Sequence, residues 1–252
     1  MTPRRTPPPP APELYRFNAL DFTAIGLYLA VAAFFTLAGA LILPLLLELA
    51  PTPAAASYGV NLIFYGLVGT VALLAARKVV SRDLKVLATR PWFTLLMVPA
   101  AVIAMMILTA VVVAASGEAQ TSANQEGLQD LVQQVPAWLM IPLLVVVGPF
   151  VEEYIFRHLL IGKLSRRVNV WVCSIISVVL FAAMHIVGQE DLTLPALLPY
   201  LAMGATLVLV YLWTGRNLMF SYFVHAAKNL LAAVMLYAIS PEVLEQLQQV
   251  QP

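Results

Sequence analysis

Charged residues and cysteine are both scarce in this chain of 252 residues. Asp, Glu, Lys and Arg make up only 11% of the sequence, whereas about 25% of an average soluble domain is charged. The single cysteine, Cys173, excludes an internal disulfide and a thiolate metal cluster. The net charge is only +1, and no basic stripe with interleaved aromatic residues occurs, so nucleic acid is not expected as a partner.

Apolar residues dominate what is present, at 61% of the sequence. Apolar runs of about 18 or more residues recur along the chain, and each is long enough to cross a lipid bilayer as a helix. We therefore predict an all-α, polytopic transmembrane bundle with seven or eight spans, in contact with the lipid bilayer. Seven spans are predicted at about residues 21–47, 57–76, 92–115, 137–162, 169–187, 195–214 and 218–239.

The domain organisation is predicted to be a single bundle with two short tails. Residues 1–18 are rich in proline and are expected to form a disordered cytoplasmic tail, because proline lacks the amide donor of a helix. Residues 19–240 should form the transmembrane bundle, and 241–252 a short polar tail. The connection 116–134 is polar and is expected outside the membrane, with a short surface helix.

The distribution of basic residues predicts the orientation, because Lys and Arg in short connections stay on the cytoplasmic side. Basic residues cluster before the first predicted span and in alternate connections, whereas the other connections carry acids. The N-terminus is therefore predicted to be cytoplasmic and the C-terminus outside. The basic residues concerned are Arg4, Arg5, Arg16, Arg77, Lys78, Arg82, Lys85, Arg90, Lys163, Arg166, Arg167 and Arg216.

An acidic pair lies in the fourth predicted span. Glu152 and Glu153 are adjacent, and Arg157 follows Glu153 by four residues, so that Glu153 and Arg157 share a helix face. Arg157 can then neutralise and orient Glu153, leaving Glu152 as the freer carboxylate for general-base work. The alternative is that both glutamates are solvated in a cytoplasmic extension of the helix.

Two histidines lie in the fifth and seventh predicted spans. Phe181 precedes His185 by one helical turn, which places its ring beside the imidazole. His225 and Asn229 are also four residues apart, and this donor-rich pair suits a developing oxyanion or a positioned water. The alternative for both is a structural role, in which His and Asn side chains hold membrane helices together.

The three patterns together favour a functional role more strongly than each alone, because a polar group at membrane depth is energetically costly unless it has a partner. If the three helices converge, the acids, histidines and amide share one polar cavity. We therefore predict that they form a single functional site.

These patterns, in this order on consecutive apolar spans, resemble the CPBP family of CAAX proteases and bacteriocin-processing proteins, which are intramembrane endopeptidases. Residues 137–239 would be the catalytic core. The resemblance implies that Glu152 and His185 activate the attacking water, and that His225 and Asn229 stabilise the oxyanion. Glu153, Arg157 and Phe181 would support the site.

The resemblance implies hydrolysis of a membrane-embedded or lipidated peptide or protein, in a bacterial plasma membrane, without a cofactor. A zinc-dependent version would use Glu152, His185 and His225 as ligands. The chain has no His-Glu-x-x-His pair on one helix, which favours the metal-free form. A proton-coupled transporter and a non-catalytic immunity or scaffold protein are the alternatives from other functional classes.

Overall fold

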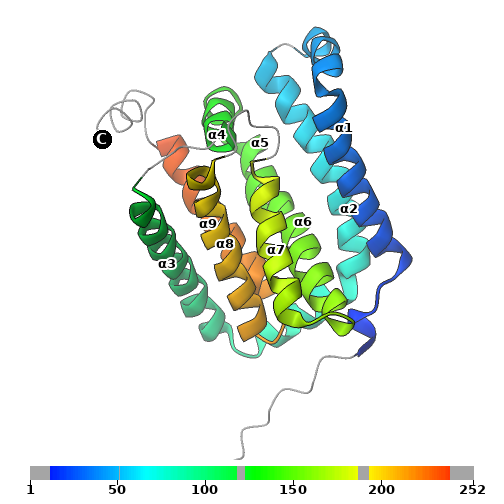
Figure 1. Ribbon diagram of the computed structural model, residues 1–252, viewed down its shortest axis with the longest axis vertical. Helices are drawn as coiled ribbons and strands as arrows, with labels where there is room; N and C mark the ends of the chain where they lie inside the picture. The colour runs from blue at the N-terminus through cyan, green and yellow to red at the C-terminus, as the bar shows by residue number, and fades with distance from the viewer. Residues whose placement is uncertain (1–11, 51, 118–122, 187–192, 239–252) are drawn as a thin grey trace, which may run out of the picture.

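The computed structural model describes residues 12–50, 52–117, 123–186 and 193–238. Within these ranges all regular secondary structure is helical. The helices stand side by side as a bundle, with α1 (Ala19–Leu49) and α2 (Pro53–Ala88) at one flank and α3 (Pro91–Ser116) at the opposite flank (Figure 1). The prediction of an all-helical membrane bundle is confirmed.

Each predicted span contains an apolar helix, although the ends of some helices differ from the predicted bounds. In the described part of the chain, six helical segments are long and apolar enough to cross a membrane, and a seventh apolar helix is shorter. The shorter one, α7, has 15 residues and ends before the predicted bound at residue 187. The last three of these helices are α7 (Val170–Met184), α8 (Leu194–Trp213) and α9 (Leu218–Ala238).

Helix α2 is longer than its predicted span, which ends near residue 76. It continues through a stretch rich in Lys and Arg to Ala88, because these side chains have good helix propensity. Asp83, in this extension, is fully buried and accepts a hydrogen bond from the amide of Leu218 at 2.6 Å. The extension therefore caps the first turn of α9 and helps to fix that helix.

The chain is ordered before the first span, over part of the predicted disordered tail. Pro12–Tyr15 form a short 3-10 helix, η1, in which Tyr15 is buried. Asn18 and Asp21 then cap α1 reciprocally, each side chain accepting from the other residue's amide. Residues 1–11 and the predicted tail 241–252 lie outside the described residues.

The fourth predicted span is one continuous rod of changing helical type. It consists of α5 (Ala137–Ile141), η2 (Pro142–Val147), α6 (Gly148–Glu152), η3 (Glu153–Lys163) and η4 (Leu164–Arg166). The segments η2 and η3 are π-helical. This form is rare in proteins overall, but where it occurs it is often at a functional site. The acidic pair therefore lies at a junction between two helical types.

The predicted surface helix in the connection 116–134 is α4 (Ala123–Gln134). Its Val132 is buried with Val135 and Met140, and the hydroxyl of Tyr237 donates to the carbonyl of Val135 at 2.7 Å. Helix α4 therefore covers the end of the bundle where α9 finishes (Figure 1).

Candidate active site

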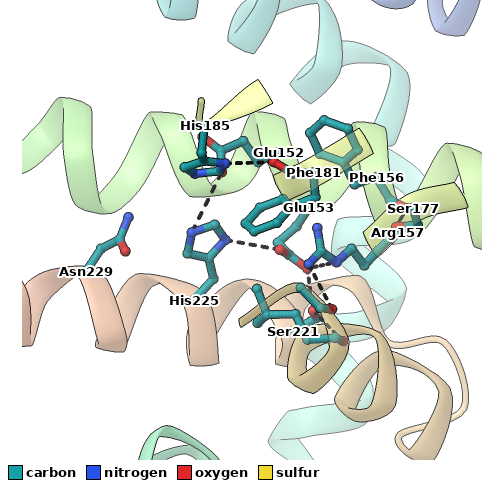
Figure 2. A network of polar contacts seen from close by, with 12 residues as sticks. Glu152, Glu153, Phe156, Arg157, Ser177, Phe181, His185, Ser221, His225 and Asn229 are labelled. Carbon is teal, nitrogen blue, oxygen red and sulfur yellow. Dashed lines mark hydrogen bonds and ion pairs between the residues drawn. The ribbon is translucent and has the colours of Figure 1, made fainter. Parts of the chain in front are cut away.

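Glu152 lies at the centre of a buried polar network that joins three helices (Figure 2). Its Oε2 atom is buried and has no hydrogen-bond partner among the residues that the structure describes. The Nε2 atoms of His185 and His225 each lie 3.8 Å from this oxygen. The structure therefore brings together the acid and both histidines that the sequence patterns singled out.

His185 directly follows the last residue of α7, so the end of this short helix lies beside Glu152. Its Nδ1 donates to the carbonyl of Phe181 at 2.8 Å, because a carbonyl oxygen can only accept. The neutral ring then carries its lone pair on Nε2, on the side of Glu152. The ring of Phe181 lies 4.6 Å from the imidazole, centroid to centroid, as the spacing predicted.

His225 is oriented by the second glutamate. Its Nδ1 donates to Oε1 of Glu153 at 3.0 Å, and both side chains are almost completely buried. The hydroxyl of Ser221, one turn earlier on α9, donates to the other oxygen of Glu153. A carboxylate on Nδ1 fixes the tautomer and stabilises the imidazolium, as the aspartate does in serine-protease triads.

Arg157 compensates the charge of Glu153 inside the bundle. Its Nε lies 3.4 Å from Oε2 of Glu153, and both side chains are fully buried. The guanidinium also lies 4.4 Å from the ring centroid of Phe181 and donates to the carbonyl of Gly204 at 3.4 Å. Glu153 is therefore engaged on both oxygens, whereas Glu152 is left open towards the histidines.

Oε2 of Glu152 is an acceptor when the carboxyl group is ionised, and Nε2 of His185 is an acceptor in the neutral ring. Nε2 of His225 is an acceptor when that imidazole is neutral and a donor when it is protonated. A separation of 3.8 Å is too long for a direct hydrogen bond, and contacts of this length are commonly bridged by water. A water molecule there could donate to Oε2 of Glu152 and to one imidazole. The arrangement is thus suited to binding and deprotonating a water.

Asn229 is the one predicted site residue that the structure keeps apart from this centre. It lies one turn beyond His225 on α9, and its Nδ2 donates to the carbonyl of Leu144 at 3.0 Å (Figure 2). In the π-helical register the amide of residue 149 would bond this carbonyl, but Pro149 has no N–H. The second N–H of the Asn229 amide is a further donor on the same helix as His225.

Two residues of the network were missed by sequence reasoning. Ser221 precedes His225 by four residues, as His225 precedes Asn229, so a polar stripe at helical spacing could have revealed it. Tyr65 donates from α2 to Oε1 of Glu152 at 3.1 Å. No pattern in the sequence marks Tyr65, because a single tyrosine in an apolar span has no distinguishing spacing.

The side chains at the centre, two imidazoles and a carboxylate, are of the types that bind the metal in catalytic zinc sites. Among the residues that the structure describes, however, no group of three His, Cys, Asp or Glu side chains is arranged to hold a metal ion.

Comparison with known proteins identifies a matching family model and two relatives. A family model for type II CAAX prenyl endopeptidases, described as Rce1-like, matches residues 134–231, which include all three motifs. The putative membrane peptidase YdiL of Bacillus subtilis is 34% identical over 119 residues, which cover 47% of this chain and 45% of that protein. The membrane-embedded CAAX protease MroQ of Staphylococcus aureus is 28% identical over 162 residues, which cover 62% of this chain and 61% of that protein.

The chain thus spans about half of one curated relative and three fifths of the other. No solved structure matches the chain significantly.

Proposed function

Because this multi-pass membrane protein belongs to the Rce1-like CAAX prenyl endopeptidase family, we propose that it is an intramembrane endopeptidase. It hydrolyses a peptide bond of a membrane-embedded or lipidated peptide or protein, using a water activated by Glu152 and His185. The observation that carries this proposal is the convergence of Oε2 of Glu152 with the Nε2 atoms of both histidines at 3.8 Å.

The first step is attack of the water on the scissile carbonyl. Nε2 of His185 accepts one hydrogen bond from the water and orients it, while Oε2 of Glu152 takes a proton as the new carbon–oxygen bond forms. Collapse of the tetrahedral intermediate breaks the carbon–nitrogen bond, and Glu152 returns the proton to the leaving amine. Glu152 is therefore unchanged after one turnover.

The oxyanion of the intermediate is stabilised from α9. His225, as an imidazolium held by Glu153, donates its Nε2–H, and the N–H of Asn229 that does not bond Leu144 is the second donor. The second donor must reach the oxyanion when substrate is bound. Because Glu153 holds His225 in place before the reaction, this donor stabilises developing charge with little reorganisation.

The transmembrane helices around the site support the proposed class of substrate and the proposed location in a membrane. A peptide or lipidated protein can reach a site between transmembrane helices from the bilayer or its surface. We place the chain in a bacterial plasma membrane, as the curated relatives come from bacteria, with the N-terminus cytoplasmic. A prenyl group on the substrate is compatible with this proposal but is not required by it.

Cleavage by purified protein in liposomes tests the proposal. A panel of quenched fluorescent peptides, some of them lipidated, is incubated with wild type, Glu152→Gln and Glu13→Gln. Glu13 is exposed near the N-terminus, so its variant is a matched control for the loss of one carboxylate. We expect cleavage by wild type and Glu13→Gln, and a loss of at least 1000-fold in Glu152→Gln.

A chelator arm decides between the two forms of the mechanism. Cleavage that survives chelation supports the glutamate-type reaction, whereas cleavage that is lost and restored by zinc supports the metal-dependent alternative. If wild type and Glu152→Gln cleave equally, or if neither cleaves any peptide of the panel, the proposed reaction is wrong. A proton-coupled transporter or a scaffold protein would then be the better interpretation of the buried network.

A further inference from the structure

The first three apolar helices lie outside the segment 134–231 that the family model matches, yet one of them reaches the site. We propose that Tyr65 of α2 is a positioning residue: its hydroxyl holds the Glu152 carboxylate so that Oε2 faces the two histidines. This inference rests on the proposed function for its catalytic consequence, but the contact itself can be tested without any cleavage.

The contact is direct. The Tyr65 hydroxyl donates to Oε1 of Glu152 at 3.1 Å, across 87 positions of sequence. The ring lies beside the helix that carries Glu152, since a Cβ added at Gly148 would come within 3.8 Å of its Cε1 atom. The ring of Tyr65 is also 4.8 Å from that of Phe64, centroid to centroid.

A glutamate needs such a donor if its two oxygens are to have different roles. The terminal torsion of a Glu side chain is broad and roughly two-fold, so an unheld carboxylate samples many orientations. Among the described residues, Tyr65 makes the one direct hydrogen bond that Glu152 accepts. With Oε1 held, Oε2 is the oxygen directed at the water position between His185 and His225.

Misplacement of a general base lowers the rate of the reaction. A shift of about 1 Å in a catalytic group can reduce the rate about 100-fold. The same shift leaves the binding of remote parts of the substrate intact, so it lowers kcat while KM stays the same. Loss of the Tyr65 hydroxyl should therefore have a different kinetic signature from a general loss of folding.

Tyr58 provides a matched control on the same helix. It lies two turns before Tyr65, and its hydroxyl donates to the carbonyl of Leu139 in α5 at 3.2 Å. Tyr58→Phe therefore also removes one hydrogen bond between α2 and the helical rod of residues 137–166, but one that does not involve Glu152. Any effect of a weakened α2 contact is common to both variants.

The kinetic experiment compares Tyr65→Phe with Tyr58→Phe in liposomes. We expect Tyr65→Phe to lower kcat about 10- to 100-fold with KM within twofold of wild type. Tyr58→Phe should keep kcat within about twofold. Equal kcat values for the two variants, or a change in KM alone, would overturn the proposal.

A chemical readout tests the contact independently of cleavage. Dicyclohexylcarbodiimide reacts with protonated carboxyl groups in apolar surroundings, and labelling of Glu152 can be followed by peptide mass spectrometry. A donor stabilises the charged form of a carboxylate, so its removal should make Glu152 react several-fold faster in Tyr65→Phe. Tyr58→Phe should react at the wild-type rate.

The two readouts separate the two proposals. If no variant cleaves peptide but Glu152 is labelled faster in Tyr65→Phe alone, the protease function fails and the positioning of Glu152 by Tyr65 stands. If the labelling rate of Glu152 is the same in all three proteins, the positioning role of Tyr65 is wrong even where wild type is an active protease.

Discussion

At the residue scale, Glu153 is the side chain that contacts most of the residues supporting the site. It accepts hydrogen bonds from His225 and Ser221 and pairs with Arg157, and all four side chains are buried. A buried ion pair of this kind is weak evidence for stability, but breaking it leaves an uncompensated charge. The pair therefore makes the network sensitive to the loss of either partner.

Glu153→Gln should destabilise the protein by about 3–5 kcal/mol, because it leaves the buried guanidinium of Arg157 without its counter-charge. The amide keeps the size of the side chain, so the effect reports charge rather than packing. Unfolding in mixed detergent micelles by increasing SDS, followed by circular dichroism, measures the free energy.

The double variant Glu153→Gln/Arg157→Met is the control for this interpretation. Removing the second charge should restore part of the lost stability, since a buried pair can be replaced by apolar or neutral groups at little cost. Strictly additive losses in the double variant would contradict a direct coupling between Glu153 and Arg157.

The support that Arg157 gives to Glu153 was predicted from four-residue spacing, because helical neighbours follow from local geometry alone. The contact of Phe181 with His185 was predicted for the same reason. The bond from Nδ1 of His225 to Glu153 was not, since it joins residues 72 positions apart. Assignment of the roles of these residues stays a prediction until the variants are measured.

At the element scale, the close approach of α2 to the helical rod of residues 137–166 decides whether Tyr65 can reach Glu152. Gly69 lies one turn after Tyr65, and a Cβ at this position would come within 2.9 Å of a Val147 methyl group and 3.5 Å of a Val151 methyl group. Valine is stiff at χ1, so the neighbour cannot easily give way. Gly69 thus allows the two helices to pack at this separation.

Gly69→Ala should push α2 away from the rod and cost about 1–3 kcal/mol through overpacking. It should also lower kcat, because Tyr65 on the same helix would be drawn away from Glu152. Gly66→Ala is the matched control: it lies on the same helix with nothing within 4 Å of the added Cβ. That variant should be neutral or stabilised by up to about 1 kcal/mol.

SDS unfolding and peptide cleavage by the two alanine variants measure both effects. An equal loss of stability in Gly66→Ala and Gly69→Ala would show that helix separation at Val147 is not the cause. A destabilised Gly69→Ala protein with wild-type kcat would separate the packing of α2 from the geometry of Glu152.

At the scale of the whole molecule, two ion pairs with buried carboxylates hold together the end of the bundle opposite α4. Asp21 of α1 accepts from Tyr154 at 2.5 Å and pairs with Lys163 at 2.5 Å, both of which belong to η3. Arg82 of α2 pairs with Asp83 and donates to Tyr15. The basic residues used to predict the orientation are therefore partly structural, and the orientation itself needs a direct test.

Cysteine labelling in whole cells measures the orientation. The native Cys173 is fully buried, so exposed cysteines can be introduced at Lys85 near the end of α2 and at Gln134 in α4. Helix α4 and the C-terminal end of α2 lie at opposite ends of the bundle (Figure 1). A membrane-impermeant maleimide should label Gln134→Cys in intact cells, and Lys85→Cys only after permeabilisation; the reverse pattern would invert the predicted topology.

The amino-acid sequence by itself determined the approximate positions of the apolar helices and the three motifs that they carry. These features depend on hydropathy and on spacings within one helix, which are local. It also predicted the polar convergence, because isolated ionisable groups are too costly in lipid.

Only the tertiary structure decided which atoms of these groups meet. It ended α7 early enough to bring His185 to Glu152, and it directed Asn229 to the carbonyl left open opposite Pro149. It also brought Tyr65 to the site from a helix that carries no motif. Contacts of this kind join residues far apart in the chain, so their geometry depends on how the helices pack and not on the pattern within any one of them.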